Sequence, residues 1–277
     1  MLIIADSGST KTTWSIVDGQ RIVQKETVGL NPLMTDEAVI RQSFQEVIEI
    51  SENRNVKKVL FYGAGCASDA LCNKVKNAIR SVVDSKEIIV RSDMYAAAHG
   101  LLKNNAGWIA ILGTGSNIAY YNGHDLKRYT PSLGYIVGDE GSGVYLGKEL
   151  LKMIYYKQCP DELIKAFYDE TTTSLSEIIE NIYRKPRANR YLASFTYFIK
   201  QNETNEFVNS LIVNSFEQFI KLHILPYKNL HAPSIAFTGS VAFIFQNQLK
   251  EVCNKYKLDV IAIEKSPMNG LIDFYTK

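Results

Sequence analysis

Two short segments rich in small polar residues carry the side chains best suited to bind phosphate. The first, residues 6–12 (DSGSTKT), lies between an apolar run at 2–5 and a β-rich run at 13–17, an order typical of a hairpin. Small residues at its tip let backbone N–H groups approach an anion closely. Asp6 can hold Mg²⁺, directly or through water. Phosphate oxygens can be met by the hydroxyl groups and the lysine that follow, namely Ser9, Thr10, Lys11 and Thr12.

A second segment repeats this arrangement in the other half of the chain. The apolar residues 109–112 lead into 113–117 (GTGSN) and then into the apolar run 118–121. Its candidate phosphate ligands are Gly113, Thr114, Gly115 and Ser116. For either segment alone, a tight hairpin without a ligand is the favoured explanation, and neither has the Walker A spacing or a following helix. As a pair, one in each half, they predict two phosphate-binding hairpins that face each other across a cleft.

Composition restricts the class of protein. The chain has 277 residues, enough for two domains, with 46% hydrophobic and 22% charged residues, as in a soluble globular protein. A net charge of +2 with scattered Lys and Arg argues against a nucleic-acid or membrane-surface partner. No apolar run reaches the roughly 18 residues of a membrane span, and the N-terminus lacks a signal-peptide pattern, so we expect a cytoplasmic protein. Four cysteines without zinc-site spacing predict neither a metal cage nor a disulfide framework.

One order of elements occurs twice: three antiparallel strands, then helix, strand, helix, strand, helix. The first copy has strands at 2–5, 12–17, 21–28, 56–62 and 87–91, and helices at 35–53 (capped by Thr35), 66–84 and 93–103. The second has strands at 108–112, 117–121, 126–129, 234–238 and 258–263, and helices at 142–227 (broken near Pro160 and Pro186), at 240–255 and after Pro267. This predicts an internal duplication with domains at 1–105 and 106–277, the second with a helical insertion at about 142–227.

Seven segments in a fixed order resemble the BadF/BadG/BcrA/BcrD-type ATPase family, and most closely its N-acetylglucosamine kinase branch within the sugar kinase, Hsp70 and actin superfamily. They are 6–12, 29–32 (GLNP), 62–66 (YGAGC), 92–94 (SDM), 113–117, 138–143 (GDEGSG) and 238–242 (TGSVA). The resemblance implies an α/β fold of two ribonuclease H-like (actin-like ATPase) domains, with the active-site cleft between them.

The resemblance also implies a function and roles for individual residues. It implies an ATP- and Mg²⁺-dependent kinase that phosphorylates an N-acetylated amino sugar, N-acetylglucosamine or N-acetylmuramic acid, in amino-sugar or cell-wall salvage. Asp93 would be the catalytic base that faces the sugar hydroxyl, and Gly239 and Ser240 would lie under the adenosine. The sugar would be bound by Asn31, Gly65, Asp93, Gly138 and Asp139. The expected partner is this small-molecule substrate, with a homodimer as the alternative to a monomer.

Several of these residues have a purely structural alternative. Asp93 fits the N-cap of a helix equally well, and both roles can hold; given the resemblance, we favour catalysis. Asn31 fits an Asn-Pro turn about as well as a sugar ligand. Asp139 and Glu140 fit an acidic first turn of a helix, but that alternative does not account for three glycines in six residues.

Two other functions are possible for such a fold. The ATPase activators of radical acyl-CoA enzymes carry a cysteine just after the second hairpin, where it ligates an iron–sulfur cluster. Here residues 117–119 (NIA) follow the hairpin, which disfavours this function because the cluster requires thiolates. A non-catalytic sugar or nucleotide sensor would be favoured by loss of Asp6, Asp93 or the glycines, and all of these are present.

Overall fold

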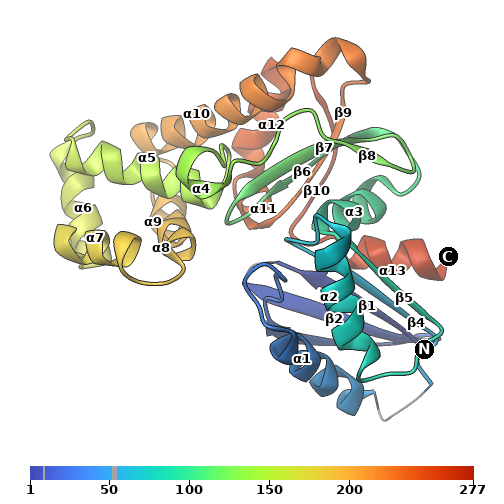
Figure 1. Ribbon diagram of the computed structural model, residues 1–277. Helices are drawn as coiled ribbons and strands as arrows, with labels where there is room; N and C mark the ends of the chain where they lie inside the picture. The colour runs from blue at the N-terminus through green and yellow to red at the C-terminus, as the bar shows by residue number, and fades with distance from the viewer. Residues whose placement is uncertain (9, 52–54) are drawn as a thin grey trace. The chain divides into compact units, whose positions relative to one another are not determined.

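The computed structural model describes residues 1–8, 10–51 and 55–277, which form two compact α/β units (Figure 1). The first unit contains Met1–Lys103 and Pro267–Lys277, and the second contains Asn104–Ser266. The chain passes from the first unit to the second between Lys103 and Asn104, two residues before the predicted boundary at 105/106. The end of the predicted second domain, 106–277, is different, because the last segment of the chain packs within the first unit.

The first unit is built on a five-stranded sheet in the order β3-β2-β1-β4-β5. Strands β1 to β3 are antiparallel, whereas β4 and β5 run parallel to β1. β1 lies in the middle, and its run of Ile3, Ile4 and Ala5 is fully buried, as expected for a strand covered on both faces. The strands are β1 (Leu2–Ser7), β2 (Lys11–Asp18), β3 (Arg21–Val28), β4 (Lys58–Gly63) and β5 (Glu87–Ser92).

The register brings the ends of the three parallel strands into one row. Ser7 pairs with Gly63, and Gly63 pairs with Ser92. The residues that follow each strand therefore lie along one edge of the sheet. In open α/β sheets, this carboxyl edge is where ligands bind.

Helices cover both faces of this sheet. On one face, α1 (Glu37–Ile50) and α2 (Asp69–Arg80) pack Phe44 and Val75 around Trp14. The other face is covered by α3 (Asp93–Ala97), the π-helix η1 (Ala98–Leu102) and the C-terminal α13 (Met268–Thr276).

Several helix boundaries differ from the sequence-based expectation, among them both ends of α2 (Asp69–Arg80). The N-cap of α1 is Asp36 and not Thr35, and the expected end near Asn53 lies outside the described residues. Helix α2 is shorter than predicted, because the turn after β4 extends to Ser68, whose hydroxyl accepts the N–H of Leu71.

Close backbone contact explains why the last helix belongs to the first unit. A Cβ atom at Gly270 of α13 would lie 1.9 Å from the carbonyl oxygen of Gly100 in η1. A Cβ at Gly100 would in turn lie 2.6 Å from the carbonyl oxygen of Pro267. The two glycines therefore let α13 contact the π-helix directly, which sequence periodicity does not reveal.

The same contact encloses His99, which is 6% exposed. Its Nδ1 lies 2.9 Å from the hydroxyl of Tyr62 and 3.2 Å from that of Tyr275, and its ring stacks on Phe274. Burial, and then the positive charge of Arg91, lowers the pKa of His99 to about 4. The folded protein therefore holds a neutral imidazole in this position.

Acidification is therefore expected to destabilise the fold through His99. Between pH 6.5 and 4 the unfolded chain binds a proton that the folded chain does not bind. The free energy of unfolding should then fall with falling pH, by about 3 kcal/mol at pH 4, and this group should add no pH dependence above 6.5. Urea denaturation of wild type, His99→Gln and the exposed control His124→Gln measures this loss. The prediction would be contradicted if the free energy of unfolding fell as much on acidification in His99→Gln as in wild type. NMR titration of the His99 imidazole is an independent check.

The second unit repeats the first. Its sheet has the order β10-β9-β6-β7-β8, with β6–β8 antiparallel and β9 and β10 parallel to β6, so each strand has a counterpart in the first sheet. The predicted duplication and the α/β fold class are thereby confirmed. The strands are β6 (Gly107–Leu112), β7 (Ser116–Tyr121), β8 (Leu126–Lys127), β9 (Ser234–Thr238) and β10 (Asp259–Glu264).

A helical insertion between β8 and β9 distinguishes this copy. Figure 1 shows α5 to α9 gathered beside the second sheet, with α10 running from them towards it. They share one hydrophobic core with the sheet, and Pro160 caps α6 where the sequence predicts a break. The inserted helices are α4 (Gly134–Val137), α5 (Gly143–Tyr155), α6 (Asp161–Thr171), α7 (Leu175–Tyr183), α8 (Ala188–Ser194), α9 (Thr196–Gln201), α10 (Glu206–His223) and the 3₁₀ helix η2 (Leu225–Leu230), and after β9 follow α11 (Ser240–Ile244) and α12 (Gln246–Lys255). Within the described part of the chain, no helix combines the length and apolarity that a membrane crossing requires.

Candidate functional site

The first predicted phosphate hairpin is a tight turn that buried hydrogen bonds hold in place. The N–H of Gly8 donates to the carbonyl of Lys11 at 2.9 Å. Behind the turn, the Thr12 hydroxyl lies 2.8 Å from the Ser7 hydroxyl and donates to the carbonyl of Val28 at 2.9 Å. Both hydroxyl-bearing residues are fully buried. The Thr12 side chain therefore supports the turn, and its contact with phosphate stays a prediction.

The other candidate ligands of this hairpin that the structure describes are Asp6, Thr10 and Lys11. Thr10 and Lys11 are exposed, and the Lys11 ammonium is paired with Glu26 on the neighbouring strand β3. Ser9 lies outside the described residues. Asp6 is half-buried near the end of β1, beside Tyr62 of β4. A carboxylate in this position offers the oxygen ligands that Mg²⁺ prefers.

The structure brings Asn31 and Gly65 into direct contact. A Cβ at Gly65 would lie only 2.0 Å from Asn31 Oδ1, and Gly65 has a φ of +84°, so a glycine is required twice over. Asn31 Oδ1 also accepts the N–H of Leu33 at 3.0 Å, as the Asn-Pro turn requires. Lys74 of α2 holds this turn by donating to the carbonyl of Pro32 at 2.9 Å. Asn31 therefore stabilises the Asn-Pro turn, and its contact with a sugar stays a prediction.

Asp93 follows β5 directly and is the first residue of α3. The N-cap is Ser92, and the Asp93 carboxylate accepts the N–H of Met94 at 2.9 Å. Burial raises the pKa of the Cys66 thiol to about 12, with smaller contributions from Cys72 and from the negative charge of Asp93. The Asp93 carboxylate is therefore close enough to Cys66, the residue after Gly65, to affect its pKa. Asn31, Gly65 and Asp93 therefore gather at the carboxyl edge of the first sheet.

The second predicted hairpin is fixed by the start of α5. The N–H of Gly143 donates to the carbonyl of Gly113 at 2.8 Å, and that of Val144 donates to the carbonyl of Thr114 at 3.1 Å. Helices leave their first N–H groups without partners inside the helix, so these bonds satisfy both elements. The hairpin therefore has a fixed relation to α5 and to the loop before it.

The acidic loop, residues 138–143, brings Asp139 onto this hairpin. A Cβ at Gly115 would lie 2.8 Å from Asp139 Oδ2, and the N–H of Ser116 donates to the same carboxylate. Burial raises the pKa of Asp139, while the Ser116 N–H and the charge of Lys148 lower it. Because α5 begins at Gly143, the acidic first turn is the wrong alternative for Asp139. Its contacts here are with the hairpin; its binding of sugar, with Gly138, stays a prediction.

Gly239 packs against the strand that leads into the second hairpin. It has a φ of +112°, and a Cβ there would lie 2.3 Å from the carbonyl oxygen of Leu112 and 3.1 Å from the nitrogen of Gly113. Ser240 is exposed as the first residue of α11. The structure thus joins the predicted adenosine segment to the predicted phosphate segment.

Two residues near the acidic loop escaped the sequence analysis. Lys148 of α5 donates to the carbonyl of Tyr135 at 2.7 Å, and its charge acts on Asp139 and Glu140. Its place in the helix that follows the loop could have suggested it. His223 contacts Glu140 from the end of α10. A separation of 83 residues leaves no local signal for that contact.

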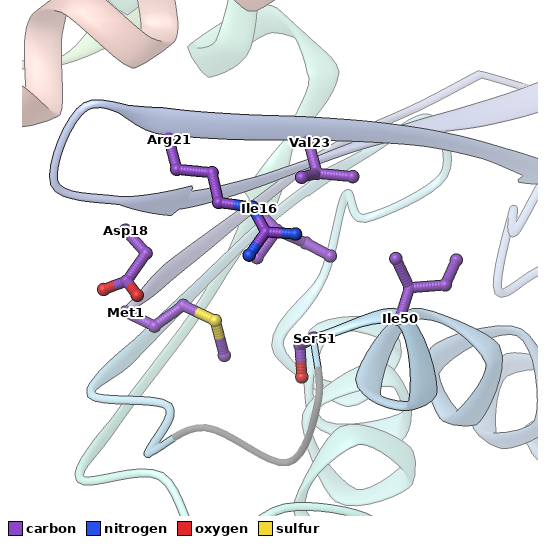
Figure 2. Close-up of a pocket in the computed structure, with 7 residues that line it drawn as sticks. All are labelled: Met1, Ile16, Asp18, Arg21, Val23, Ile50 and Ser51. Carbon is purple, nitrogen blue, oxygen red and sulfur yellow. The ribbon is translucent and has the colours of Figure 1, made fainter.

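A hollow elsewhere in the first unit is not part of this site. It lies beside Met1, at the end of β1 remote from the hairpin (Figure 2). Apolar side chains and the ends of Asp18 and Arg21 surround it. The lining residues are Met1, Ile16, Asp18, Arg21, Val23, Ile50 and Ser51.

Solved structures similar to this chain include several sugar kinases. The putative N-acetylglucosamine kinase from Porphyromonas gingivalis is 37% identical with a TM-score of 0.93, and the match covers 99% of this chain and 98% of that one. A second, from Chromobacterium violaceum, is 16% identical with a TM-score of 0.76, covering 99% and 98%. A ROK family glucokinase from Streptomyces griseus, in complex with glucose and AMPPNP, is 16% identical with a TM-score of 0.61, covering 99% and 97%; at this identity the shared property is the fold. No protein-family model matches the sequence. No curated protein matches it either.

Proposed function

We propose that this chain, which belongs to the same sugar-kinase family as the Porphyromonas gingivalis protein, transfers the terminal phosphoryl group of ATP to a hydroxyl of an N-acetylated amino sugar. N-acetylglucosamine is the first candidate acceptor and N-acetylmuramic acid the second, in salvage of amino sugars or cell-wall sugars. We also assign the chain to the N-acetylglucosamine kinase branch of the BadF-type family, on the seven segments described above.

The observation that carries this proposal is the group formed by Asn31, Gly65 and Asp93 at the carboxyl edge of the first sheet. It combines a carboxylate with an amide at a sheet edge where ligands bind. The hairpin after β1 lies on the same edge of the same sheet, because Ser7 pairs with Gly63. An acceptor hydroxyl group and a phosphate group can therefore both be met by this unit.

Phosphoryl transfer requires mainly positioning and neutralisation of charge. In this proposal Asp93 orients the acceptor hydroxyl and accepts its proton as the new P–O bond forms and ADP leaves. Asn31 hydrogen-bonds another hydroxyl of the sugar. Thr10, Lys11 and the turn at residues 113–116 bind the phosphates, and Gly239 and Ser240 receive the adenosine. Mg²⁺ near Asp6 would neutralise phosphate charge when bound.

A coupled assay of ADP release tests the proposal. We expect Mg²⁺-dependent ATP consumption that is low without sugar and rises sharply with an N-acetylated hexosamine. The panel should contain N-acetylglucosamine, N-acetylmuramic acid, the free amino sugars and glucose, with an EDTA control.

Equal rates of ADP release with and without every sugar would contradict the kinase proposal. An ATPase activator would then be the better assignment, and that class needs a cluster-ligating cysteine after the second hairpin. Binding of sugar without any ATP consumption would instead favour the sensor.

A further inference from the structure

A chain of three polar side chains supports the acidic loop. His223 Nε2, at the end of α10, lies 3.2 Å from the carboxylate of Glu140, and its Nδ1 lies 2.8 Å from the hydroxyl of Thr130. Both side chains of the contact between His223 and Glu140 are mostly buried, with 17% of His223 and 16% of Glu140 exposed. These hydrogen bonds thus connect the acidic loop to α10 and to the segment after β8.

The chemistry of the groups fixes the direction of the hydrogen bond between His223 and Glu140. An ionised carboxylate only accepts, so Nε2–H donates to Glu140. In the neutral imidazole Nδ1 then accepts from the Thr130 hydroxyl, whereas in the imidazolium Nδ1–H donates to that hydroxyl. The ring also packs on Phe219 of the same helix, with 5.2 Å between centroids. His223 is therefore held on both nitrogens and on one face.

The loop has a conformation that needs such support. Asp139 has a φ of +63°, which non-glycine residues seldom adopt. Gly141, with a φ of +77°, approaches α10 so closely that a Cβ would lie 3.1 Å from Phe219 Cβ. The loop is thus held against α10 at Glu140 and at Gly141, while Asp139 reaches the second hairpin.

We propose that His223 is a positioning residue: through Glu140 it fixes the acidic loop so that the Asp139 carboxylate stays on Gly115 and Ser116. The activity readout of this inference rests on the proposed kinase function, whereas the positioning itself does not. A displacement of about 1 Å at such a site can cost roughly a hundredfold in rate. If His223 only stabilised the fold, its loss would lower the melting temperature and leave turnover of the folded protein unchanged.

Two amide variants of the same residue separate the two contacts. In His223→Gln the amide nitrogen takes the place of Nε2 and keeps the bond to Glu140. In His223→Asn the amide group takes the place of Nδ1 and keeps the bond to Thr130 only. We expect kcat to fall about 10- to 100-fold in His223→Asn, with a smaller change in the KM for ATP, and to stay close to wild type in His223→Gln.

Hydrogen exchange gives a readout that needs no substrate. The N–H groups of Ser142, Gly143 and Val144 bond to the loop and the second hairpin, so they should exchange faster in His223→Asn than in His223→Gln or wild type. Glu140→Ala should reproduce the effect of His223→Asn. The variant that combines the two substitutions should be no worse than either alone, because both remove the same contact between His223 and Glu140. If His223→Asn does not fold, Glu140→Ala in the wild-type and His223→Gln backgrounds tests the same contact.

Equal turnover and equal exchange in all variants would overturn the inference. Equal impairment of the Gln and Asn variants would also overturn it, because the contact with Glu140 would then not be the one that matters. Faster exchange in His223→Asn, in a protein whose wild type no sugar activates, would support the positioning and reject the kinase function.

Discussion

Asp93→Asn should lower turnover by about 10²- to 10⁴-fold and leave the melting temperature nearly unchanged. In the proposed reaction the carboxylate orients the acceptor hydroxyl and takes its proton, and an amide cannot accept that proton. The amide oxygen can still accept the N–H of Met94, which the carboxylate accepts at 2.9 Å, so the start of α3 is preserved. Sugar binding should weaken much less than turnover, because the amide still hydrogen-bonds a hydroxyl.

Asp69→Asn is the matched control for this substitution. Asp69 is also the first residue of a helix and also follows a serine N-cap, but it is exposed. It should keep wild-type turnover. The measurements are steady-state kinetics with the preferred sugar and thermal unfolding. If Asp93→Asn keeps more than about a tenth of wild-type turnover, Asp93 is not the base, and Asp139 becomes the next carboxylate to test.

Gly239→Ala should destabilise the protein and weaken nucleotide binding together. A side chain at a φ of +112° is strained, which costs about 1–3 kcal/mol. The added Cβ would also lie 2.3 Å from the backbone oxygen of Leu112, and such overpacking costs about 1–3 kcal/mol more. Because a backbone atom cannot rotate away, the start of the second hairpin must shift. Urea denaturation and calorimetric binding of AMPPNP measure the two effects.

Gly134→Ala separates strain from steric conflict. Gly134 has a φ of +72°, but among the described residues no atom lies within 4 Å of the position its Cβ would take. This control should lose only the stability that backbone strain costs and should bind AMPPNP normally. Equal stability and equal nucleotide affinity in the two variants would refute the importance of the Gly239 contact.

The order of elements and the positions of both hairpins were predictable because they depend on local pattern. β3 and β9 have the predicted boundaries, since apolar or alternating runs between turn residues specify strands without help from distant parts of the chain. The repeated strand order follows from the same patterns, because each copy presents its strands and helices in one sequence. Asp93 and Gly239 could be singled out through the resemblance to the kinase family, and in the structure each directly follows a strand.

Tertiary structure decided where those elements and side chains go. Whether Thr12 faces a ligand depends on Ser7 and Val28, which lie on other strands. The placement of α13 in the first unit depends on two glycines that are 170 positions apart, and the contact of Glu140 with His223 spans 83. Packing and hydrogen bonds between distant segments carry no periodic signal in the sequence, so only the folded chain shows which residues they join.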